Sequence, residues 1–136
     1  MEKITVEVLI EADIEKVWQC WTEPEHIKNW NSASDDWHTP RAVNDVQVGG
    51  MFNIRMEAKD GSEGFDFEGV YTSVEHHKYI EYSMTDGRKV AVTFEMNDGT
   101  CKVTETFDPE SENSIEMQKD GWQSILNNFK KYVESL

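Results

Sequence analysis

The strongest periodic pattern of the chain lies at its C-terminus, where apolar residues recur every three or four positions. Within residues 114–136 they are Ile115, Trp122, Ile125, Leu126, Phe129, Tyr132, Val133 and Leu136. This spacing places them on one helical face and predicts a long amphipathic helix, with Asn113 able to cap its start. Gly121 is unexpected there, because an interior glycine costs about 1 kcal/mol relative to alanine. Close approach of a facing element, room at a cavity mouth or a packing kink would explain it.

The first third of the chain changes its period twice. Residues 3–11 alternate between apolar and polar side chains, which predicts a half-buried strand. From Asp13 the apolar residues follow helical spacing, and a second short helix is expected after Thr22-Glu23-Pro24-Glu25, where threonine can act as a cap. Residues 31–40 show no period and are rich in Asn, Ser and Asp. We expect a loop there, whose Trp37 folds back over an apolar surface.

Turn signals divide the middle of the chain into short strands. Three Asp-Gly pairs, at residues 60–61, 86–87 and 98–99, are typical of tight turns. The segments expected to form strands are residues 41–46, 51–59, 65–74, 79–84, 90–96 and 101–107. A sheet with one apolar face needs a cover, and the long helix is the only predicted element large enough. The pattern therefore predicts an α+β fold in which a curved antiparallel sheet of about six or seven strands wraps a long C-terminal helix, with two short helices after the first strand.

Composition and charge narrow the classes of partner. The length of 136 residues suits a single domain, residues 1–136, and 27 acidic against 13 basic residues give a net charge of −14. Such a charge disfavours nucleic acids and anionic lipid surfaces. No segment resembles a signal peptide or a membrane span, so we expect a cytoplasmic protein, a monomer or weak dimer, with free thiols at Cys20 and Cys101.

Several motifs, taken together in their order and spacing, resemble a known family. They are Glu15-x-Val17-Trp18-x-x-Trp21-Thr22-x-Pro24-Glu25 followed by Trp30, Val48-Gly49-Gly50, Lys59-Asp60-Gly61, Gly69-Val70-Tyr71, Val103-Thr104-Glu105-Thr106 and Gly121-Trp122-x-x-x-Leu126. The chain resembles the START-like (SRPBCC, helix-grip) superfamily. It is most similar to the branch named for the C-terminal domain of the activator of the ninety-kilodalton heat-shock chaperone ATPase.

The resemblance implies a hydrophobic cavity between sheet and helix, closed at one end by the short helices. Members of the superfamily bind lipids, hormones and polyketides, or act as cyclases and hydrolases. The residues expected to line the cavity are Trp37, Phe52, Ile54, Met56, Phe67, Tyr82, Met84, Phe94, Glu105, Trp122 and Leu126. Taken singly, their aromatic and methionine members are more typical of an ordinary core than of a ligand site.

Glu105 is the candidate for polar chemistry. It alternates with Val103 and Phe107, so an inward-facing strand would place its carboxyl group in the cavity, where burial raises a pKa or demands a cation. Arg55 is a possible partner, although alternation puts it opposite Phe52 and Ile54. A bulge that turns Glu105 to solvent is the alternative.

The sequence predicts no metal, cofactor or catalytic constellation. Asp35, Asp36 and His38 lack a recognised ligand spacing, and the chain has neither a Gly-x-Ser-x-Gly elbow nor a phosphate loop. His26 and the pair His76-His77 are expected to be solvated.

Three functions remain open. The first is binding of a small apolar or amphipathic molecule, without catalysis. The second is a protein-interaction module related to the chaperone activators, whose activity belongs to eukaryotic proteins with an added N-terminal chaperone-binding domain. The third is a cyclase- or hydrolase-type enzyme that uses Glu105 as general acid or base.

Overall fold

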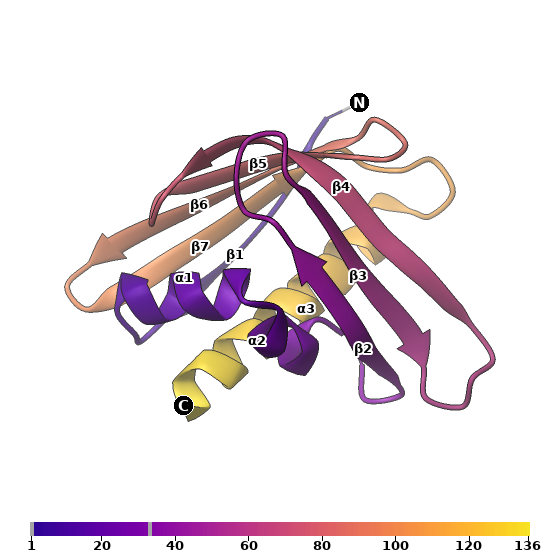
Figure 1. The fold of residues 1–136 in the computed structure, drawn as a ribbon, viewed down its shortest axis with the longest axis horizontal. Helices are drawn as coiled ribbons and strands as arrows, with labels where there is room; N and C mark the ends of the chain where they lie inside the picture. The colour runs from indigo at the N-terminus through magenta and orange to yellow at the C-terminus, as the bar shows by residue number, and fades with distance from the viewer. Residues whose placement is uncertain (1, 33) are drawn as a thin grey trace.

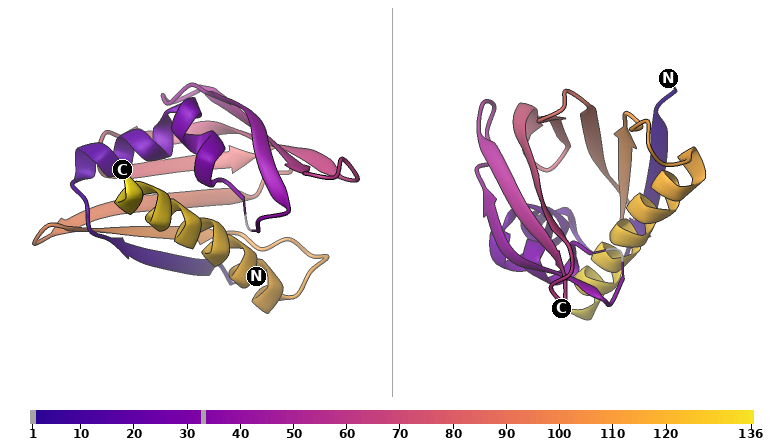
Figure 2. Two further views of the ribbon diagram at one scale, coloured as in Figure 1. Left: turned by 90° about the horizontal axis from the view of Figure 1, so that it is seen from below. Right: turned by 90° about the vertical axis from the view of Figure 1, so that its right-hand side faces the viewer.

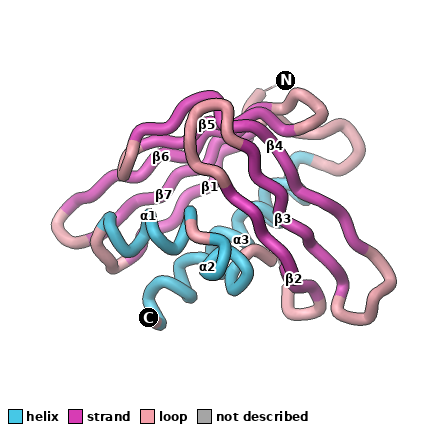
Figure 3. Tube along the Cα trace, in the orientation of Figure 1, coloured by secondary structure: helices cyan, strands magenta, loops and turns pink. Residues whose placement is uncertain are grey.

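A computed structural model describes residues 2–32 and 34–136. Within these residues one strand is followed by two short helices, six further strands and a long helix (Figures 1 and 3). In chain order the elements are β1 (Ile4–Ile10), α1 (Ile14–Thr22), α2 (Pro24–Trp30), β2 (Trp37–Asn44), β3 (Met51–Ala58), β4 (Gly64–Glu75), β5 (Tyr79–Met84), β6 (Lys89–Asn97), β7 (Thr100–Phe107) and α3 (Ile115–Ser135). The α+β fold expected from the sequence is confirmed.

The strands form one antiparallel sheet in the order β1-β7-β6-β5-β4-β3-β2. Figure 2 shows the sheet curled around α3, with α1 and α2 beside the C-terminal half of that helix. Gly69 lies where β4 passes β5 and the Phe52 ring. A Cβ atom at this position would lie 2.6 Å from the carbonyl oxygen of Ser83, so only glycine fits without a shift.

Alternation along the strands creates the core. Inward-facing residues such as Val6, Val92 and Val103 are almost fully buried, as are Phe129 and Val133 on the facing side of α3. Burial of this apolar surface is the main stabilising contribution of the fold. Three aromatic contacts hold α3 against the rest of the fold: Phe107 stacks on Trp122 with ring centres 3.9 Å apart, and Trp21 and Trp30 both pack against Phe129.

Trp37 begins a strand, which corrects the expectation of a loop across residues 31–40. It lies opposite Ala58 of β3, and the pairing of β2 with β3 shifts register between His38 and Arg41. Pro40 falls in that irregularity on an edge strand, where a missing N–H group is tolerated. Because of the proline and the polar composition, the sequence pattern predicted this strand only from residue 41 onward, and its first residues were assigned to a loop. Ala33, within the predicted loop, lies outside the described residues.

Two of the expected helix caps are wrong. Ser114, not Asn113, caps the start of α3, because its hydroxyl accepts a hydrogen bond from the Met117 N–H at 3.1 Å. Thr22 lies inside α1 and donates to the Trp18 carbonyl, so that Glu23 precedes α2 without a side-chain cap. Among the described residues, no helix is long and apolar enough to cross a membrane.

Candidate functional site

A cavity of about 470 Å³ lies between the sheet and α3. Its walls come from Trp21 of α1, from α2, from the inner faces of β2 to β5, from one position of β7, from the first half of α3 and from loop residues between these elements. The lining residues are Trp21, Ile27, Trp30, Asn31, Ser34, Trp37, Asn44, Phe52, Ile54, Met56, Phe65, Phe67, Tyr71, Tyr82, Met84, Arg88, Glu105, Glu110, Asn113, Met117, Gln118, Gly121, Trp122 and Ile125. Most of this surface is apolar, as in sites for small organic molecules.

Nine of the eleven residues expected at a cavity line this one. The other two, Phe94 and Leu126, are not among its lining residues. Phe94 packs against Trp18 and Trp21, with ring centres 5.2 and 5.8 Å away, and Leu126 is fully buried in the core. Phe94 is thus covered by α1, and Leu126 belongs to the packed part of the core. Ligand contact by the nine others stays a prediction.

Aromatic side chains from three neighbouring strands form one wall. The Phe52 ring centre lies 4.8 Å from that of Tyr82, 5.4 Å from that of Phe67 and 5.5 Å from that of Tyr71. Phe67 in turn faces Trp122 of α3 across 6.4 Å. These edge and tilted contacts fix the ring orientations, so the wall is preorganised.

Glu105 is the one acidic side chain buried among the described residues, with 6% of its surface exposed. It occupies an inward position of β7, opposite Val6 of β1 and Val92 of β6. Nothing in residues 2–32 and 34–136 forms a hydrogen bond or ion pair with its side chain. Burial raises its pKa from 4.5 to about 8. The carboxyl group is therefore predominantly protonated at neutral pH, and its ionised form lacks compensation.

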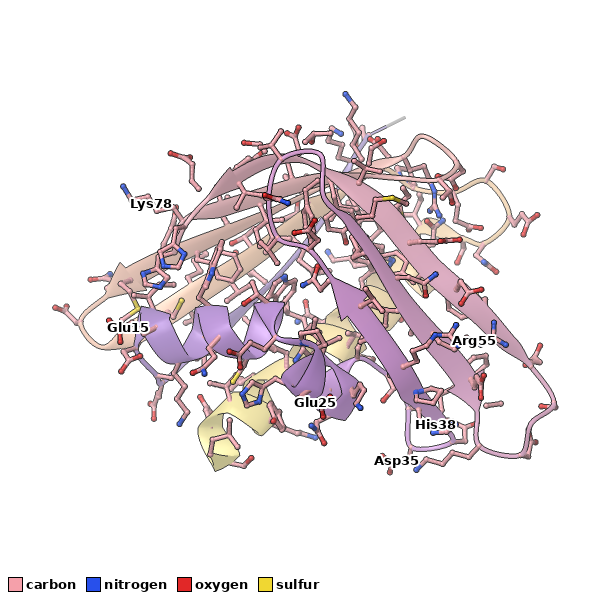
Figure 4. The ribbon with its side chains drawn as sticks, in the orientation of Figure 1. Glu15, Glu25, Asp35, His38, Arg55 and Lys78 are labelled. Atoms are coloured by element: carbon pink, nitrogen blue, oxygen red, sulfur yellow. The ribbon has the colours of Figure 1, made fainter. Side chains whose placement is uncertain are left out.

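Arg55 is not the partner of Glu105. Its guanidinium lies on the outer face of β3, 2.8 Å from Glu57 and 3.6 Å from Asp66 (Figure 4). Strand alternation decides this, since Phe52 and Ile54 point inward. Burial also raises the pKa of Tyr82 well above 10, with the nearby Glu105 carboxyl group as a further cause.

Exposed lining residues mark a mouth between the β3–β4 hairpin and the start of α3. Phe65 is 48% exposed and Met117 is 61% exposed, although both are large and apolar. Gln118 holds the loop before α3 in place: its amide donates to the carbonyl oxygens of Glu110 and Asn113, at 3.1 and 2.9 Å. The mouth thus has a large apolar side chain on each side, and the hydrogen bonds of Gln118 support the loop beside it.

Gly121 lines the cavity on α3, and a Cβ atom there would meet nothing within 4 Å. Close approach of another element does not explain this glycine. The structure agrees instead with the explanation that this glycine leaves room at the cavity.

The sequence did not single out several lining residues. Phe65 and Tyr71 share the inward face of β4 with Phe67, so alternation alone could have found them. Asn31 has no comparable signal: it follows α2, and its side-chain nitrogen is buried without a partner among the described residues. Tyr71 donates to the Asn44 amide oxygen, a contact that joins residues 27 positions apart.

The histidines and acidic residues do not assemble a metal site. Within the described ranges no group of three or more His, Cys, Asp or Glu side chains has a suitable arrangement. Figure 4 shows Asp35 and His38 near the start of β2, and His38 lies 3.9 Å from Glu57. His26 is not simply solvated, because its Nδ1 atom lies 2.6 Å from the Tyr132 hydroxyl of α3.

Comparison with known sequences and structures assigns the chain to a family. The sequence profile described as "Activator of Hsp90 ATPase homolog 1-like protein" matches residues 11–134. No curated protein sequence matches the chain. An AHSA1-like protein from Aeromonas hydrophila has 49% identity and a TM-score of 0.92, with 98% of this chain and 92% of that chain covered. A protein from Cytophaga hutchinsonii has 53% identity and a TM-score of 0.85, over the same shares of the two chains.

A more distant structure has the same fold. The Aha1 dimer from Colwellia psychrerythraea has 17% identity and a TM-score of 0.76, with 98% of this chain and 97% of that chain covered. The profile match spans nearly the whole chain, and the resemblance inferred from the motifs is confirmed. The chain belongs to the family of Activator of Hsp90 ATPase homolog 1-like proteins.

Proposed function

We propose that the protein binds a small apolar or amphipathic molecule in the cavity between its sheet and α3. The observation that carries this proposal is the cavity of about 470 Å³, whose wall is built from Phe52, Phe67, Tyr82 and Trp122. Sites for small organic ligands have volumes of roughly 300–1,000 Å³ and the same combination of apolar walls with few polar groups. The apolar mouth at Phe65 and Met117 gives such a molecule a route of entry.

Native mass spectrometry of freshly purified protein tests the proposal directly, because a retained molecule appears as added mass. Thermal-shift measurements across a panel of lipids and polyketides provide the second readout, since a ligand that binds only the folded state raises the melting temperature. We expect a retained molecule or at least one shift that saturates with concentration. Absence of both results would contradict the proposal.

A matched pair of variants at one position localises the ligand. Gly121→Leu introduces a side chain into open space beside the cavity, whereas Gly121→Ala adds only one methyl group. Leucine and alanine both favour helices, so both variants should keep α3 intact. We expect the leucine variant to lose binding and the alanine variant to keep it. Equal affinity in the two variants would place the ligand elsewhere.

A second candidate function is activation of a chaperone ATPase through the outer surface of the sheet. Val43, Met51 and Val70 are 58%, 61% and 38% exposed on adjacent strands, and Met51 lies directly opposite Val70. Exposed apolar groups of this kind are common at protein interfaces. An ATPase assay with the ninety-kilodalton chaperone tests this function, and Met51→Ser should abolish any stimulation without altering ligand binding. An unchanged ATPase rate on addition of the wild-type protein would reject it.

A further inference from the structure

We propose that the ligand is a cationic amphiphile, a molecule with a flat apolar or aromatic body and one protonated amine that meets the Glu105 carboxylate. The inference rests on the ligand-binding function proposed above and adds the chemical class of the ligand. Three features of the site support it: an unpaired buried carboxyl group, aromatic walls and an acidic rim.

The carboxyl group has room for a donor and lacks one. Glu105 lines the cavity and is buried, and no described residue bonds to its side chain. The neighbours of Glu105 across the sheet, Val6 and Val92, offer no polar atom from their side chains. A buried carboxylate is stable only when a cation or several donors meet it. A primary ammonium group supplies three N–H donors and a compensating charge.

The walls favour the cationic form of such a ligand. Aromatic rings attract a cation placed over their faces within about 6 Å of the ring centre. Phe52, Phe67, Tyr82 and Trp122 line the same cavity as Glu105, from the four elements β3, β4, β5 and α3. An aromatic ligand body can pack against these rings while its amine reaches the carboxylate.

The charge distribution disfavours an anionic ligand. Glu110 lines the cavity, and the exposed residues Glu112 and Glu116 belong to the same loop and helix start. Among the described residues of the lining, Arg88 is the only arginine or lysine, and its Nε atom lies 2.7 Å from Asp86. With a net charge of −14, the protein attracts cations over long distances and repels fatty acids.

Binding of an amine should release a proton. Val6 on β1 and Val92 on β6 lie opposite Glu105 in the sheet, Tyr82 on β5 is near enough to feel its charge, and Trp122 and Ile125 on α3 line the same cavity. Of these only Tyr82 titrates, and burial keeps it neutral. The pKa of Glu105, about 8, makes the free site a carboxylic acid at pH 7. When the ammonium ion binds, it keeps its own proton, and the carboxyl proton passes to the buffer.

Isothermal titration calorimetry with three compounds on one skeleton tests this inference: naphthylethylamine, naphthylethanol and naphthylpropionic acid. Titrations near pH 7 in two buffers of different ionisation enthalpy measure the protons released. We expect the amine to bind about tenfold or more tightly than the alcohol and to release close to one proton. The alcohol should release none, and the acid should bind most weakly.

Glu105→Gln provides the variant test, because it keeps the shape of the side chain and removes its charge. The affinity for the amine should fall by about tenfold or more, its proton release should vanish, and the affinity for the alcohol should change by less than about twofold. Glu95→Gln, an exposed position on β6, is the matched control and should leave all three titrations unchanged. The proton count on the wild-type protein needs no variant, so it stands even if Glu105→Gln folds poorly.

Two results would overturn the cationic class while leaving ligand binding intact. One is that the alcohol or the acid binds as tightly as the amine and that binding of the amine releases no proton. The other is a purified protein that retains only neutral or anionic molecules. If none of the three compounds binds, and native mass spectrometry and the thermal-shift panel are also negative, the proposed ligand-binding function itself fails.

Discussion

Glu105 couples the stability of the fold to pH. Its pKa in the folded protein, about 8, exceeds its ordinary value of 4.5, because burial disfavours the carboxylate. Between these values the folded chain holds a proton that the unfolded chain has released. The free energy of unfolding should therefore be highest below about pH 4.5, as far as this group is concerned, and fall as the pH rises to about 8.

Glu105→Gln should remove this dependence. Between pH 5 and pH 9, titration of Glu105 should lower the free energy of unfolding of the wild-type protein by roughly 3 to 5 kcal/mol. The glutamine variant has no titrating group at this position, so it should not show this loss. Urea denaturation at the two pH values measures the difference. Glu95→Gln, which changes an exposed carboxylate, should keep the wild-type slope. Parallel slopes in the wild type and Glu105→Gln would show that the buried carboxyl group does not titrate in this range.

Gly121→Ala should stabilise the protein by about 0.5 to 1 kcal/mol, because alanine favours a helix interior and its methyl group meets nothing within 4 Å. Gly69→Ala makes a sharp comparison. There the added methyl group would lie 2.6 Å from the Ser83 carbonyl oxygen, so this variant should be destabilised. Chemical denaturation of both variants measures the two effects. A destabilised Gly121→Ala would mean that α3 packs more closely there than the structure shows.

Side-chain direction was largely predictable from the sequence, and cavity depth was not. The alternation of Val103, Glu105 and Phe107 left two orientations open for the carboxyl group, inward on a regular strand or outward at a bulge, and the structure has the inward one. Alternation says only which face a residue takes, so Phe94 was indistinguishable from Tyr82, although Phe94 packs against α1 and only Tyr82 lines the cavity. Asn31 follows a helix and carries no periodic signal, so its place at the cavity required the three-dimensional structure.

At the scale of elements, the end of a helix depends on one hydrogen bond. The Ser114 hydroxyl accepts the Met117 N–H, whereas the side chain of Asn113 forms no hydrogen bond with a described residue. Ser114→Ala should therefore reduce the free energy of unfolding by about 1 kcal/mol, and Asn113→Ala should change it by only a few tenths. Urea denaturation of the pair separates the two assignments. A larger loss in the asparagine variant would restore Asn113 as the cap.

Helices and central strands were predicted better than boundaries. The periods of α3 and α1 are strong because each buries one face, and the Asp-Gly turns separated the middle strands correctly. Asn113 and Ser114 are equally good caps in composition, so the sequence could not choose between them. The β2 strand was shortened in the prediction because Pro40 and its polar neighbours resemble a loop. Pairing with β3, a long-range contact, decides the outcome.

For the whole molecule, the excess of negative charge should lower the stability of the folded state. Its ion pairs, such as Lys3–Asp108 and Lys130–Glu134, lie on the surface. Such exposed pairs are worth about 0–1 kcal/mol each. They compete with the mutual repulsion of 27 acidic side chains against 13 basic ones. Because the excess of negative charge is large, repulsion should outweigh the ion pairs.

Added salt should therefore stabilise this protein. Screening shortens the range of electrostatic interaction from about 30 Å at 0.01 M salt to about 8 Å at 0.15 M, which weakens repulsion across the surface. We expect the free energy of unfolding, measured by urea titration near pH 7, to rise over this range. Equal concentrations of sodium and potassium chloride should act alike, because screening depends on ionic strength. If salt instead lowers the stability, the few ion pairs contribute more than the net charge, and the acidic surface is organised to offset its own repulsion.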